Sequence, residues 1–460
     1  MLNFRLSEIA AAIGASFDGK TDGKIEEISL DSRAVNARTL FIAIRGERFD
    51  GHDYIDSALE NGAAAAVSMR PEDGKNPRVL TVENTEQALC DIARAHRMKF
   101  RIPVVGVTGS VGKTTTKDMI ACVLGEKYRV KKTEANHNNQ IGMPKTLLEL
   151  TESDEAAVME MGSQGPGDVR QLTFCAMPLA AVITKIGVSH LEQFGTRENI
   201  LRGKLEIGES LPENGTLILN GDDPYLMSAL EEQRRLHHVV TYAIDNHGAD
   251  LYAEEISGGA YSQSFILCRG EERASVYLPV GGLHNVYNAL AALSAGLALG
   301  VDLQKGIDAL GRFEPSGQRQ RMTPCKGRTV IEDCYNASPD SMDASLHVLT
   351  RCDEGPKIAV LGDMLELGDI AETAHRQIGE LAASLQVDLV LCLGPQAKWI
   401  CEGAQASSGG RTRAVWFDDP GLLIETLLQA ALPGSTILFK ASHGMHFEKL
   451  IEEFTARLDG

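Results

Sequence analysis

Apolar residues along the chain recur as short, β-branched runs that alternate with longer amphipathic segments. Runs at residues 103–107, 156–161, 179–184 and 216–220 are each followed by glycine or turn residues and then by a helical pattern. Short continuous apolar runs of this kind are typical of parallel strands that are buried on both faces. The alternation therefore predicts an α/β sheet with mostly parallel strands in the middle of the chain.

A second series of strand-like runs lies nearer the C-terminus. It begins after an alanine-rich helical pattern at residues 288–299 and comprises residues 329–333, 357–361, 388–393 and 435–439. Helical patterns separate these runs, so they predict a second, Rossmann-like α/β sheet. The first part of the chain alternates shorter apolar stretches with turn residues, which predicts a smaller α/β unit.

The chain length indicates more than one domain. A chain of 460 residues is too long for one ordinary hydrophobic core, and two or three domains are expected. A helical pattern at residues 85–100 connects the first unit to the second. We therefore predict an α/β protein of three domains, at residues 1–84, 85–314 and 315–460.

Composition narrows the function classes. The formal net charge of −18 argues against a nucleic-acid partner, because binding to a phosphate backbone requires a clustered basic face. The sequence has no apolar run long enough to span a bilayer and no N-terminal signal pattern, so we expect a cytoplasmic protein without membrane insertion. Nine scattered cysteines form no C-x-x-C pair and are expected to be ordinary thiols.

A glycine-rich turn joins the first central strand to the next helix, with the sequence T-G-S-V-G-K-T at residues 108–114. Backbone N–H groups of such a turn can point at phosphate oxygens, and the helix N-terminus adds its positive dipole end. Lys113 supplies a mobile charge, and the Thr114 hydroxyl can bind Mg²⁺. A plain glycine turn would explain neither the lysine nor the threonines after it. The predicted phosphate contacts are Gly109, Ser110, Gly112, Lys113, Thr114 and Thr115.

This loop lacks the first glycine of the Walker pattern, whose place is taken by Val107. A T-G-x-x-G-K-T loop without that glycine resembles the loop of the Mur ligase family and of its folylpolyglutamate synthase relatives. The resemblance implies an enzyme that uses ATP to activate a carboxylate as an acyl phosphate and then joins it to an amine.

Phosphoryl transfer requires Mg²⁺ with hard oxygen ligands, which the ends of neighbouring strands can supply. Glu160 ends an apolar run, although a solvated carboxylate at a strand end has the same pattern. By resemblance to the Mur ligases, Glu160 and His190 bind the metal together with Thr114. Lys204 lies in G-K-L-E-I, similar to the family's A-K-x-E-I, in which the lysine is carbamylated and becomes an anionic metal ligand. The resemblance implies catalytic roles for Lys113, His190 and Lys204.

Three further motifs are similar to nucleotide contacts of the family. The segment H-N-V-Y-N-A-L-A-A matches H-N-x-x-N-x-x-A-A, whose second asparagine, here Asn288, lies against adenine. Arg319, in S-G-Q-R, resembles an arginine that reaches the phosphates from the third domain, with Arg321 as the alternative. Asp333 matches a residue near the ribose of ATP.

Two segments resemble one branch of the family, which joins D-alanyl-D-alanine to a UDP-N-acetylmuramoyl-tripeptide. They are E-D-C-Y-N-A-S-P-D-S-M at residues 332–342 and V-L-G-D-M-L-E-L-G at residues 360–368. In the first domain, residues 31–33 (D-S-R) and 40–52 (L-F-I-A-I-R-G-E-R-F-D-G-H) resemble UDP-binding segments of that branch, and residues 133–142 resemble a loop near the muramoyl peptide. The substrate contacts implied by the resemblance are Ser32, Arg33, Arg45, Gly46, Thr133 and Asn138.

The resemblance covers all three domains and implies a monomeric ligase of peptidoglycan precursor synthesis that uses ATP and Mg²⁺. One position departs from the family, because K-G-S-R-x-M reads K-A-S-H-G-M and His443 replaces the arginine. Another Mur ligase, folylpolyglutamate synthase, and a regulatory or transport ATPase are the alternatives at this point. The third residue of the tripeptide, lysine or diaminopimelate, stays open.

Overall fold

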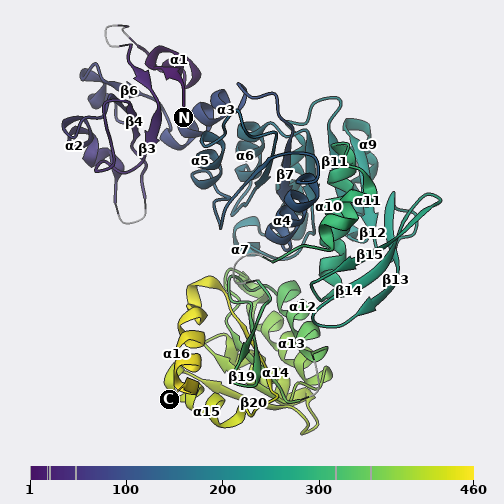
Figure 1. The fold of residues 1–460 in the computed structure, drawn as a ribbon. Coiled ribbons are helices and arrows are strands. Elements are labelled where there is room, and N and C mark those ends of the chain that lie inside the picture. The colour runs from purple at the N-terminus through teal and green to yellow at the C-terminus, as the bar shows by residue number, and fades with distance from the viewer. Residues whose placement is uncertain are drawn as a thin grey trace.

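The computed structural model describes residues 2–17, 19, 22–46, 49–315, 319–352 and 355–459. Figure 1 shows three α/β units, with the N-terminal unit in purple, the central unit in blue and teal, and the C-terminal unit in green and yellow. In this view the C-terminal unit lies below the central unit, and the N-terminal unit lies to the left. The motif residues outside the described part are Glu47, Arg48, Ser316, Gly317 and Gln318.

The N-terminal unit is built on a four-stranded parallel sheet with the order β3-β4-β5-β6. Its strands are β3 (Glu27–Ser29), β4 (Thr39–Ile42), β5 (Ala65–Ser68) and β6 (Val79–Thr81). Its helices are α1 (Leu6–Ala12), α2 (Ile55–Glu60) and the 3-10 helices η1 (Gly51–Tyr54) and η2 (Pro71–Lys75). A separate antiparallel pair is formed by β1 (Phe4–Arg5) and β2 (Lys24–Ile25). Because the four strands are parallel, their carboxyl ends meet at one edge of the sheet.

Helix α3 (Thr85–Arg97) joins the N-terminal unit to the central unit. Its Leu89 and Ile92 belong to the core of the first sheet, whereas its Cys90 and Ala93 belong to the core of the second. One helix therefore serves two hydrophobic cores. The domain boundaries at residues 84/85 and 314/315 stay predictions.

The central unit contains a nine-stranded sheet with the order β15-β14-β13-β12-β11-β10-β7-β9-β8. Its strands are β7 (Val104–Thr108), β8 (Val130–Lys132), β9 (Ala156–Glu160), β10 (Ala180–Ile183), β11 (Thr216–Asn220), β12 (His238–Ala243), β13 (Leu251–Gly258), β14 (Gln263–Arg269) and β15 (Glu272–Leu278). The strands from β8 to β13 are parallel, and β13, β14 and β15 pair antiparallel. Its helices are α4 (Lys113–Leu124), α5 (Gly142–Leu148), α6 (Asp168–Ala176), α7 (Leu191–Phe194), α8 (Arg197–Leu205), η3 (Glu206–Gly208), α9 (Pro224–Leu236), α10 (Leu283–Ala298) and α11 (Leu303–Leu310).

Both faces of the parallel part of this sheet are buried. Val105 and Val107 of β7 pack into a core shared with α4 and α10, while Val104 packs into a second core on the other face. Strand side chains alternate between faces, so a strand covered on both sides is apolar throughout. The parallel strands predicted for the centre of the chain are confirmed. The antiparallel extension over residues 251–278 is not among the predicted elements.

The C-terminal unit has a six-stranded sheet with the order β16-β17-β21-β18-β19-β20, parallel except for β16. Its strands are β16 (Arg321–Cys325), β17 (Arg328–Glu332), β18 (Lys357–Gly362), β19 (Leu389–Leu393), β20 (Arg413–Phe417) and β21 (Thr436–Lys440). Its helices are α12 (Pro339–Thr350), η4 (Gly368–Ile370), α13 (Ala371–Ser384), α14 (Ala397–Ser407), α15 (Pro420–Ala430), η5 (His443–Met445) and α16 (Phe447–Asp459). The predicted class of three α/β domains with mostly parallel sheets is confirmed.

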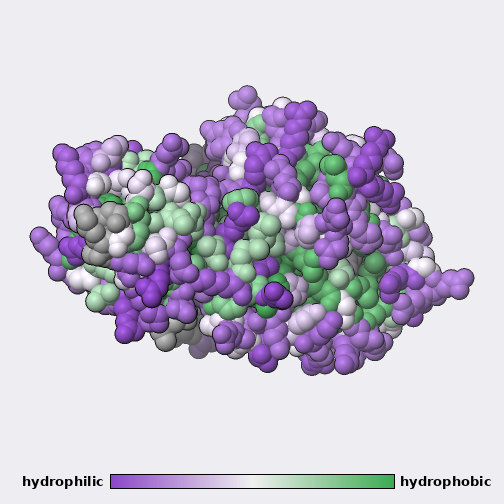
Figure 2. Space-filling model, turned by 90° about the horizontal axis from the view of Figure 1, so that it is seen from above, coloured by the Kyte–Doolittle hydropathy of each residue, from purple (hydrophilic) through white to green (hydrophobic). Residues whose placement is uncertain are grey.

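Polar and charged side chains cover much of the face seen in Figure 2, as expected for a chain with a net charge of −18. Within the described residues, no helix combines the length and apolar character needed to cross a membrane. No disulfide joins the nine cysteines, all of which belong to the described residues, and most of them are buried.

Candidate active site

A cavity of about 1340 Å³ lies between the central and C-terminal units. Its lining includes Glu160 and His190 from the central unit and Arg319, Asp333 and Lys440 from the C-terminal unit. Strand β7 lies between β10 and β9, where successive connections run to opposite sides of the sheet. Open α/β sheets bind ligands at the carboxyl ends of strands at such a point. None of the described residues of the N-terminal four-stranded sheet lines this cavity.

The phosphate loop, residues 108–112, is shaped by two glycines with positive φ. Gly109 has a φ of 141° and Gly112 a φ of 81°. A Cβ on Gly109 would lie 2.0 Å from Thr184 Oγ1, and a Cβ on Gly112 would lie 2.8 Å from Asn288 Oδ1. Glycine alone combines these backbone conformations with so close an approach. The two glycines therefore allow β7 to turn directly into α4.

Hydrogen bonds fasten this loop to the end of β10. The Thr184 hydroxyl donates to the carbonyl of Val111 at 2.6 Å, and the backbone N–H of Ser110 donates to the carbonyl of Lys185 at 2.8 Å. The position of the loop is therefore tied to the segment that follows β10.

Lys113 is the first residue of α4, and its side chain folds back over the loop. Its Nζ donates to the carbonyls of Gly109 at 2.8 Å and Ser110 at 3.3 Å. Burial lowers the pKa of Lys113 to about 8, while Glu160 opposes the shift and Arg319 adds to it. An ammonium group bonds more strongly to phosphate than to neutral carbonyls, so Lys113 Nζ can exchange its two carbonyl partners for an anionic ligand.

Glu160 ends β9 and is 1% exposed. One of its oxygens accepts a hydrogen bond from Thr114 Oγ1 at 2.8 Å, and the other accepts one from Asn138 Nδ2 at 2.9 Å. Lys117 Nζ lies 3.9 Å from the same carboxylate. The backbone N–H of Glu160 donates to Thr133 Oγ1 at 3.0 Å. Thr133 is fully buried and positions Glu160, and its predicted substrate contact stays a prediction.

Lys204 and His190 lie within electrostatic reach of the phosphate loop. Lys204 is 2% exposed, donates to Ser163 Oγ and forms no ion pair with a described residue. Burial, reinforced by the charge of Lys113, lowers the pKa of Lys204 to about 7. His190 precedes α7 with a φ of 59°, and its Nδ1 lies 2.5 Å from Glu366 Oε2. Burial lowers the pKa of His190, Glu366 opposes this, and Lys113 again adds to it.

The C-terminal unit contributes two groups of side chains to the cavity. The Arg319 guanidinium lies 4.2 Å from the centre of the Tyr335 ring. Asp333 Oδ2 accepts hydrogen bonds from Lys440 Nζ at 2.7 Å and from Ser345 Oγ at 2.6 Å. These bonds fix the carboxylate that we predict near the ribose.

The other predicted nucleotide contacts in the cavity lining are Ser110, Gly112, Lys113, Thr114, Thr115, Asn288 and the alternative Arg321, whereas Gly109 is not part of the lining. Asn288 is 6% exposed, and its amide is already bonded to Thr116 and Asn285. Its predicted contact with adenine stays a prediction.

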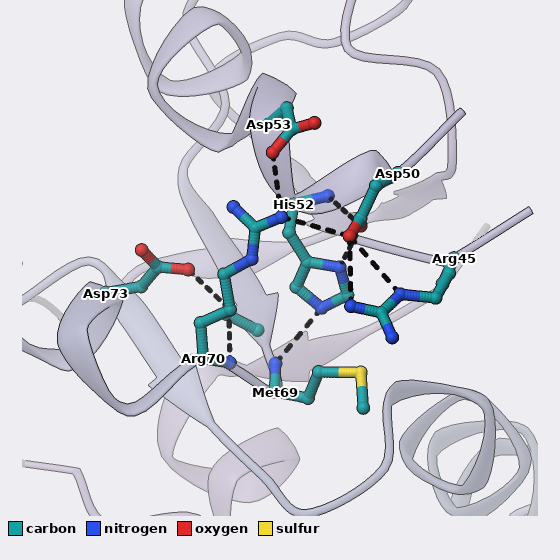
Figure 3. Close-up of polar contacts among 8 residues, drawn as sticks. Arg45, Asp50, His52, Asp53, Met69, Arg70 and Asp73 are labelled. Atoms are coloured by element: carbon teal, nitrogen blue, oxygen red, sulfur yellow. Dashed lines mark hydrogen bonds and ion pairs between the residues drawn. The ribbon is translucent and has the colours of Figure 1, made fainter.

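Asp50 organises a polar cluster in the N-terminal unit (Figure 3). Its Oδ2 accepts hydrogen bonds from Arg45 Nε and Nη2 at 3.3 Å and from Arg70 Nη2 at 3.0 Å. Its Oδ1 accepts from the His52 backbone N–H at 3.0 Å and lies 2.5 Å from His52 Nδ1. His52 Nε2 accepts from the Met69 backbone N–H at 3.2 Å, so Nδ1 carries the proton. The backbone N–H and the ring of His52, together with Arg70, hold the pKa of Asp50 well below its usual range.

The predicted substrate contacts of the N-terminal unit follow the carboxyl ends of neighbouring strands. Ser32 and Arg33 follow β3, whereas Arg45 and Gly46 follow β4. The structure therefore brings them to one edge of the parallel sheet. Arg70, which follows β5 and is bonded to the same carboxylate as Arg45, is not among the predicted residues. Its place directly after an apolar run is the signal that could have identified it.

Two carboxylates of the C-terminal unit contact the segment after β10. Besides the Glu366 pair with His190, Asp340 Oδ1 lies 2.6 Å from Lys185 Nζ. A Cβ on Gly187 would lie 2.4 Å from Asp340 Oδ2. Both carboxylates lie in the motifs at residues 332–342 and 360–368, but no sequence pattern indicates which residues of another domain they meet.

A phosphate loop in a cavity between two of three α/β domains is the arrangement of a nucleotide-binding enzyme. The chain belongs to the Mur ligase family. Family models match it at residues 24–98 (Mur ligase family, catalytic domain), 107–296 (Mur ligase middle domain) and 311–443 (Mur ligase, glutamate ligase domain). The predicted resemblance is confirmed.

The more detailed similarity is to one member of the family. The chain is 39% identical to the UDP-N-acetylmuramoyl-tripeptide–D-alanyl-D-alanine ligase of Bacillus subtilis, over 93% of each chain. A crystal structure of MurF from Acinetobacter baumannii is 31% identical, with a TM-score of 0.91 and coverage of 99% of both chains. The MurF ligase from Thermotoga maritima in complex with ADP is 32% identical, with a TM-score of 0.84 and coverage of 94% of this chain and 98% of that one.

The glycine geometry of the phosphate loop can be tested by substitution. We expect Gly109→Ala to lower turnover about tenfold or more, equivalent to about 1.4 kcal/mol, because the added methyl displaces Thr184 from Val111. ADP binding by calorimetry and ADP release under turnover are the measurements. Gly195→Ala is the control, since Gly195 has a φ of 77° and no atom within 4 Å of an added Cβ. Equal losses in the two variants would contradict the importance of the Thr184 contact.

Proposed function

We propose that this protein is an ATP-dependent ligase that joins D-alanyl-D-alanine to UDP-N-acetylmuramoyl-tripeptide in peptidoglycan precursor synthesis. The observation that carries the proposal is the convergence of Lys113, buried Glu160 and Arg319 of the opposite domain on one cavity. The similarity to relatives that bear this activity in their names, over nearly the whole chain, supports the substrates.

The reaction has two chemical steps. In the first, an oxygen of the tripeptide's terminal carboxylate attacks the γ-phosphorus of ATP, the bond to the bridging oxygen breaks, and ADP leaves with that electron pair. In the second, the amine of D-alanyl-D-alanine attacks the acyl carbon, inorganic phosphate leaves, and the nitrogen releases a proton. Phosphorylation supplies the leaving group that a free carboxylate lacks.

Residues of this chain act mainly by charge and position. The backbone N–H groups of the phosphate loop and Lys113 Nζ hold the phosphates, and Arg319 faces them from the C-terminal domain. These positive groups stabilise the negative charge that spreads over the transferring phosphoryl group.

The predicted metal ligands are Thr114, Glu160, His190 and carbamylated Lys204. Glu160 is held by Thr114 and Asn138, so a buried hard oxygen donor is already oriented. In the described residues, no group of three or more His, Cys, Asp and Glu side chains is arranged to hold a metal. A carbamate on Lys204 would supply the anionic oxygen donor that this set lacks, so the residues fit the ion. Mg²⁺ bound there would offset the charge of the phosphate oxygens.

The overall reaction and the role of Lys113 are tested together. Wild-type protein should release ADP only when both UDP-N-acetylmuramoyl-tripeptide and D-alanyl-D-alanine are present, and Lys113→Ala should reduce that rate by about 10² or more, because the mobile charge on the phosphates is lost. A panel that replaces either substrate with glutamate or with a shorter UDP-peptide checks specificity. ADP release without any acceptor amine would favour a regulatory or transport ATPase.

The carbamate on Lys204 is tested by chemical rescue. Lys204→Ala should lose activity and recover part of it with added acetate or another short carboxylate, since these anions can replace the carbamate oxygens. Intact-mass measurement under bicarbonate provides a second readout. Full activity of Lys204→Ala without rescue would contradict the carbamate role.

Asp50 is predicted to position the substrate contacts in the N-terminal domain. Asp50→Asn should raise the KM for the UDP substrate severalfold with little change in the KM for ATP, because Arg45 and Arg70 lose their shared ionic partner. Steady-state kinetics with each substrate varied in turn measure this difference. Asp56→Asn, on neighbouring helix α2, is the matched control, and an equal rise in both KM values would contradict a local role.

A further inference from the structure

A line of side-chain hydrogen bonds connects the phosphate-loop helix to the start of the C-terminal domain. Thr116 Oγ1 donates to Asn288 Oδ1 at 3.0 Å, and Asn288 Nδ2 donates to Asn285 Oδ1 at 3.0 Å. Asn285 Nδ2 then donates to Gln320 Oε1 at 3.2 Å. His284 Nε2 lies 3.0 Å from the same Gln320 oxygen. We call Thr116, Asn288, Asn285 and Gln320 the amide relay.

The side chains of the relay are largely shielded from water. Thr116 is 0%, Asn285 3% and Asn288 6% exposed, so their polar atoms have little access to water. Buried polar groups need partners, and removal of one member leaves its neighbours unsatisfied. Each of the two asparagines accepts from one neighbour and donates to the next, and Asn285 Nδ2 also donates to the Gly281 carbonyl at 2.7 Å. These bonds fix the orientation of both amides.

The two ends of the relay are close in sequence to Lys113 and Arg319, the two cations that are proposed to face the phosphates. Thr116 is in the first turn of α4, three residues after Lys113. Gln320 directly follows Arg319 and has a φ of 51°, a left-handed conformation that few residues other than glycine adopt. The Gln320 side chain is therefore anchored to the central domain while its backbone carries the arginine of the C-terminal domain.

We propose that Asn285, Asn288 and Gln320 are positioning residues that set the place of Arg319 relative to the phosphate loop. The inference rests on the proposed function, because Arg319 has its task only if ATP phosphates lie in the cavity. The Tyr335 ring lies 4.2 Å from the Arg319 guanidinium within the C-terminal domain. The relay adds a connection from the neighbouring residue Gln320 to the central domain. The oxygen and one N–H of Asn288 are used within the relay, which gives this asparagine a role other than contact with a base.

A network that only stabilises the fold and a network that acts through Arg319 should differ in the turnover of their double variants. A structural network affects stability, and its loss multiplies with the loss of any catalytic group elsewhere. A positioning network has no further effect on turnover once the residue that it positions has been removed. A double-mutant cycle on turnover separates the two.

The test uses full-length protein with Asn285→Leu, Arg319→Ala and the double variant. We expect Asn285→Leu to reduce kcat for ADP release about tenfold and to add less than twofold to the loss caused by Arg319→Ala. Gln320→Asn keeps the amide and tolerates the left-handed backbone but is one methylene too short for the bond, so it should reproduce the loss without a buried cavity. Ser294→Ala is the control, since Ser294 is buried on the same helix and, among the described residues, its hydroxyl donates to the Leu290 carbonyl at 2.8 Å, outside the relay.

A second readout does not depend on turnover. Hydrogen exchange of residues 319–325 in the ADP-bound protein should rise in Asn285→Leu and Gln320→Asn and stay at the wild-type level in Ser294→Ala. Unchanged exchange in both relay variants, or fully multiplicative losses of kcat in the cycle, would overturn the inference. If the wild-type protein released no ADP with the proposed substrates, the proposed function would fail while the exchange experiment still decided the positioning role.

Discussion

The contact between the phosphate loop and the end of β10 is the constraint on which the rest of the site depends. Thr184 can donate to Val111 only because Gly109 has no Cβ, which would lie 2.0 Å from the Thr184 hydroxyl. The same strand end continues into the segment that carries Lys185 and His190, both of which meet the C-terminal domain. A shift of the loop would therefore shift the residues of the domain contact, since they belong to one short stretch of backbone.

Positive side chains lie close to one another in the cleft, although the chain as a whole is acidic. The net charge is −18, yet the positive charge of Lys113 acts on Lys204, and that of Arg319 acts on Lys113. Burial penalises the charged form of a lysine, so the pKa falls to about 8 for Lys113 and to about 7 for Lys204. Bound phosphates would favour the charged form of Lys113, whereas the lowered pKa of Lys204 leaves more of the neutral amine that carbamylation requires.

The parts of this molecule that could be predicted from the sequence are those that depend on local order. Apolar runs identify the parallel strands, and one of these runs places Glu160 at a strand end. The glycine turn after Val107 identifies the phosphate loop. Partners that are distant in the chain could not be predicted, because no periodicity encodes that Glu366 meets His190. Asn288 is an intermediate case, since the motif identifies the residue while its bonds to neighbouring amides become visible only in three dimensions.

The contacts between the central and C-terminal domains differ in how easily they can be exchanged. The Lys185 and Asp340 side chains are 43% and 23% exposed, and ion pairs of this kind add little stability. The amide relay, in contrast, is largely buried and lies beside the chain connection at Gln320. Loss of the exposed pair should therefore cost less than loss of a relay member, because removing a buried partner leaves its neighbours unsatisfied.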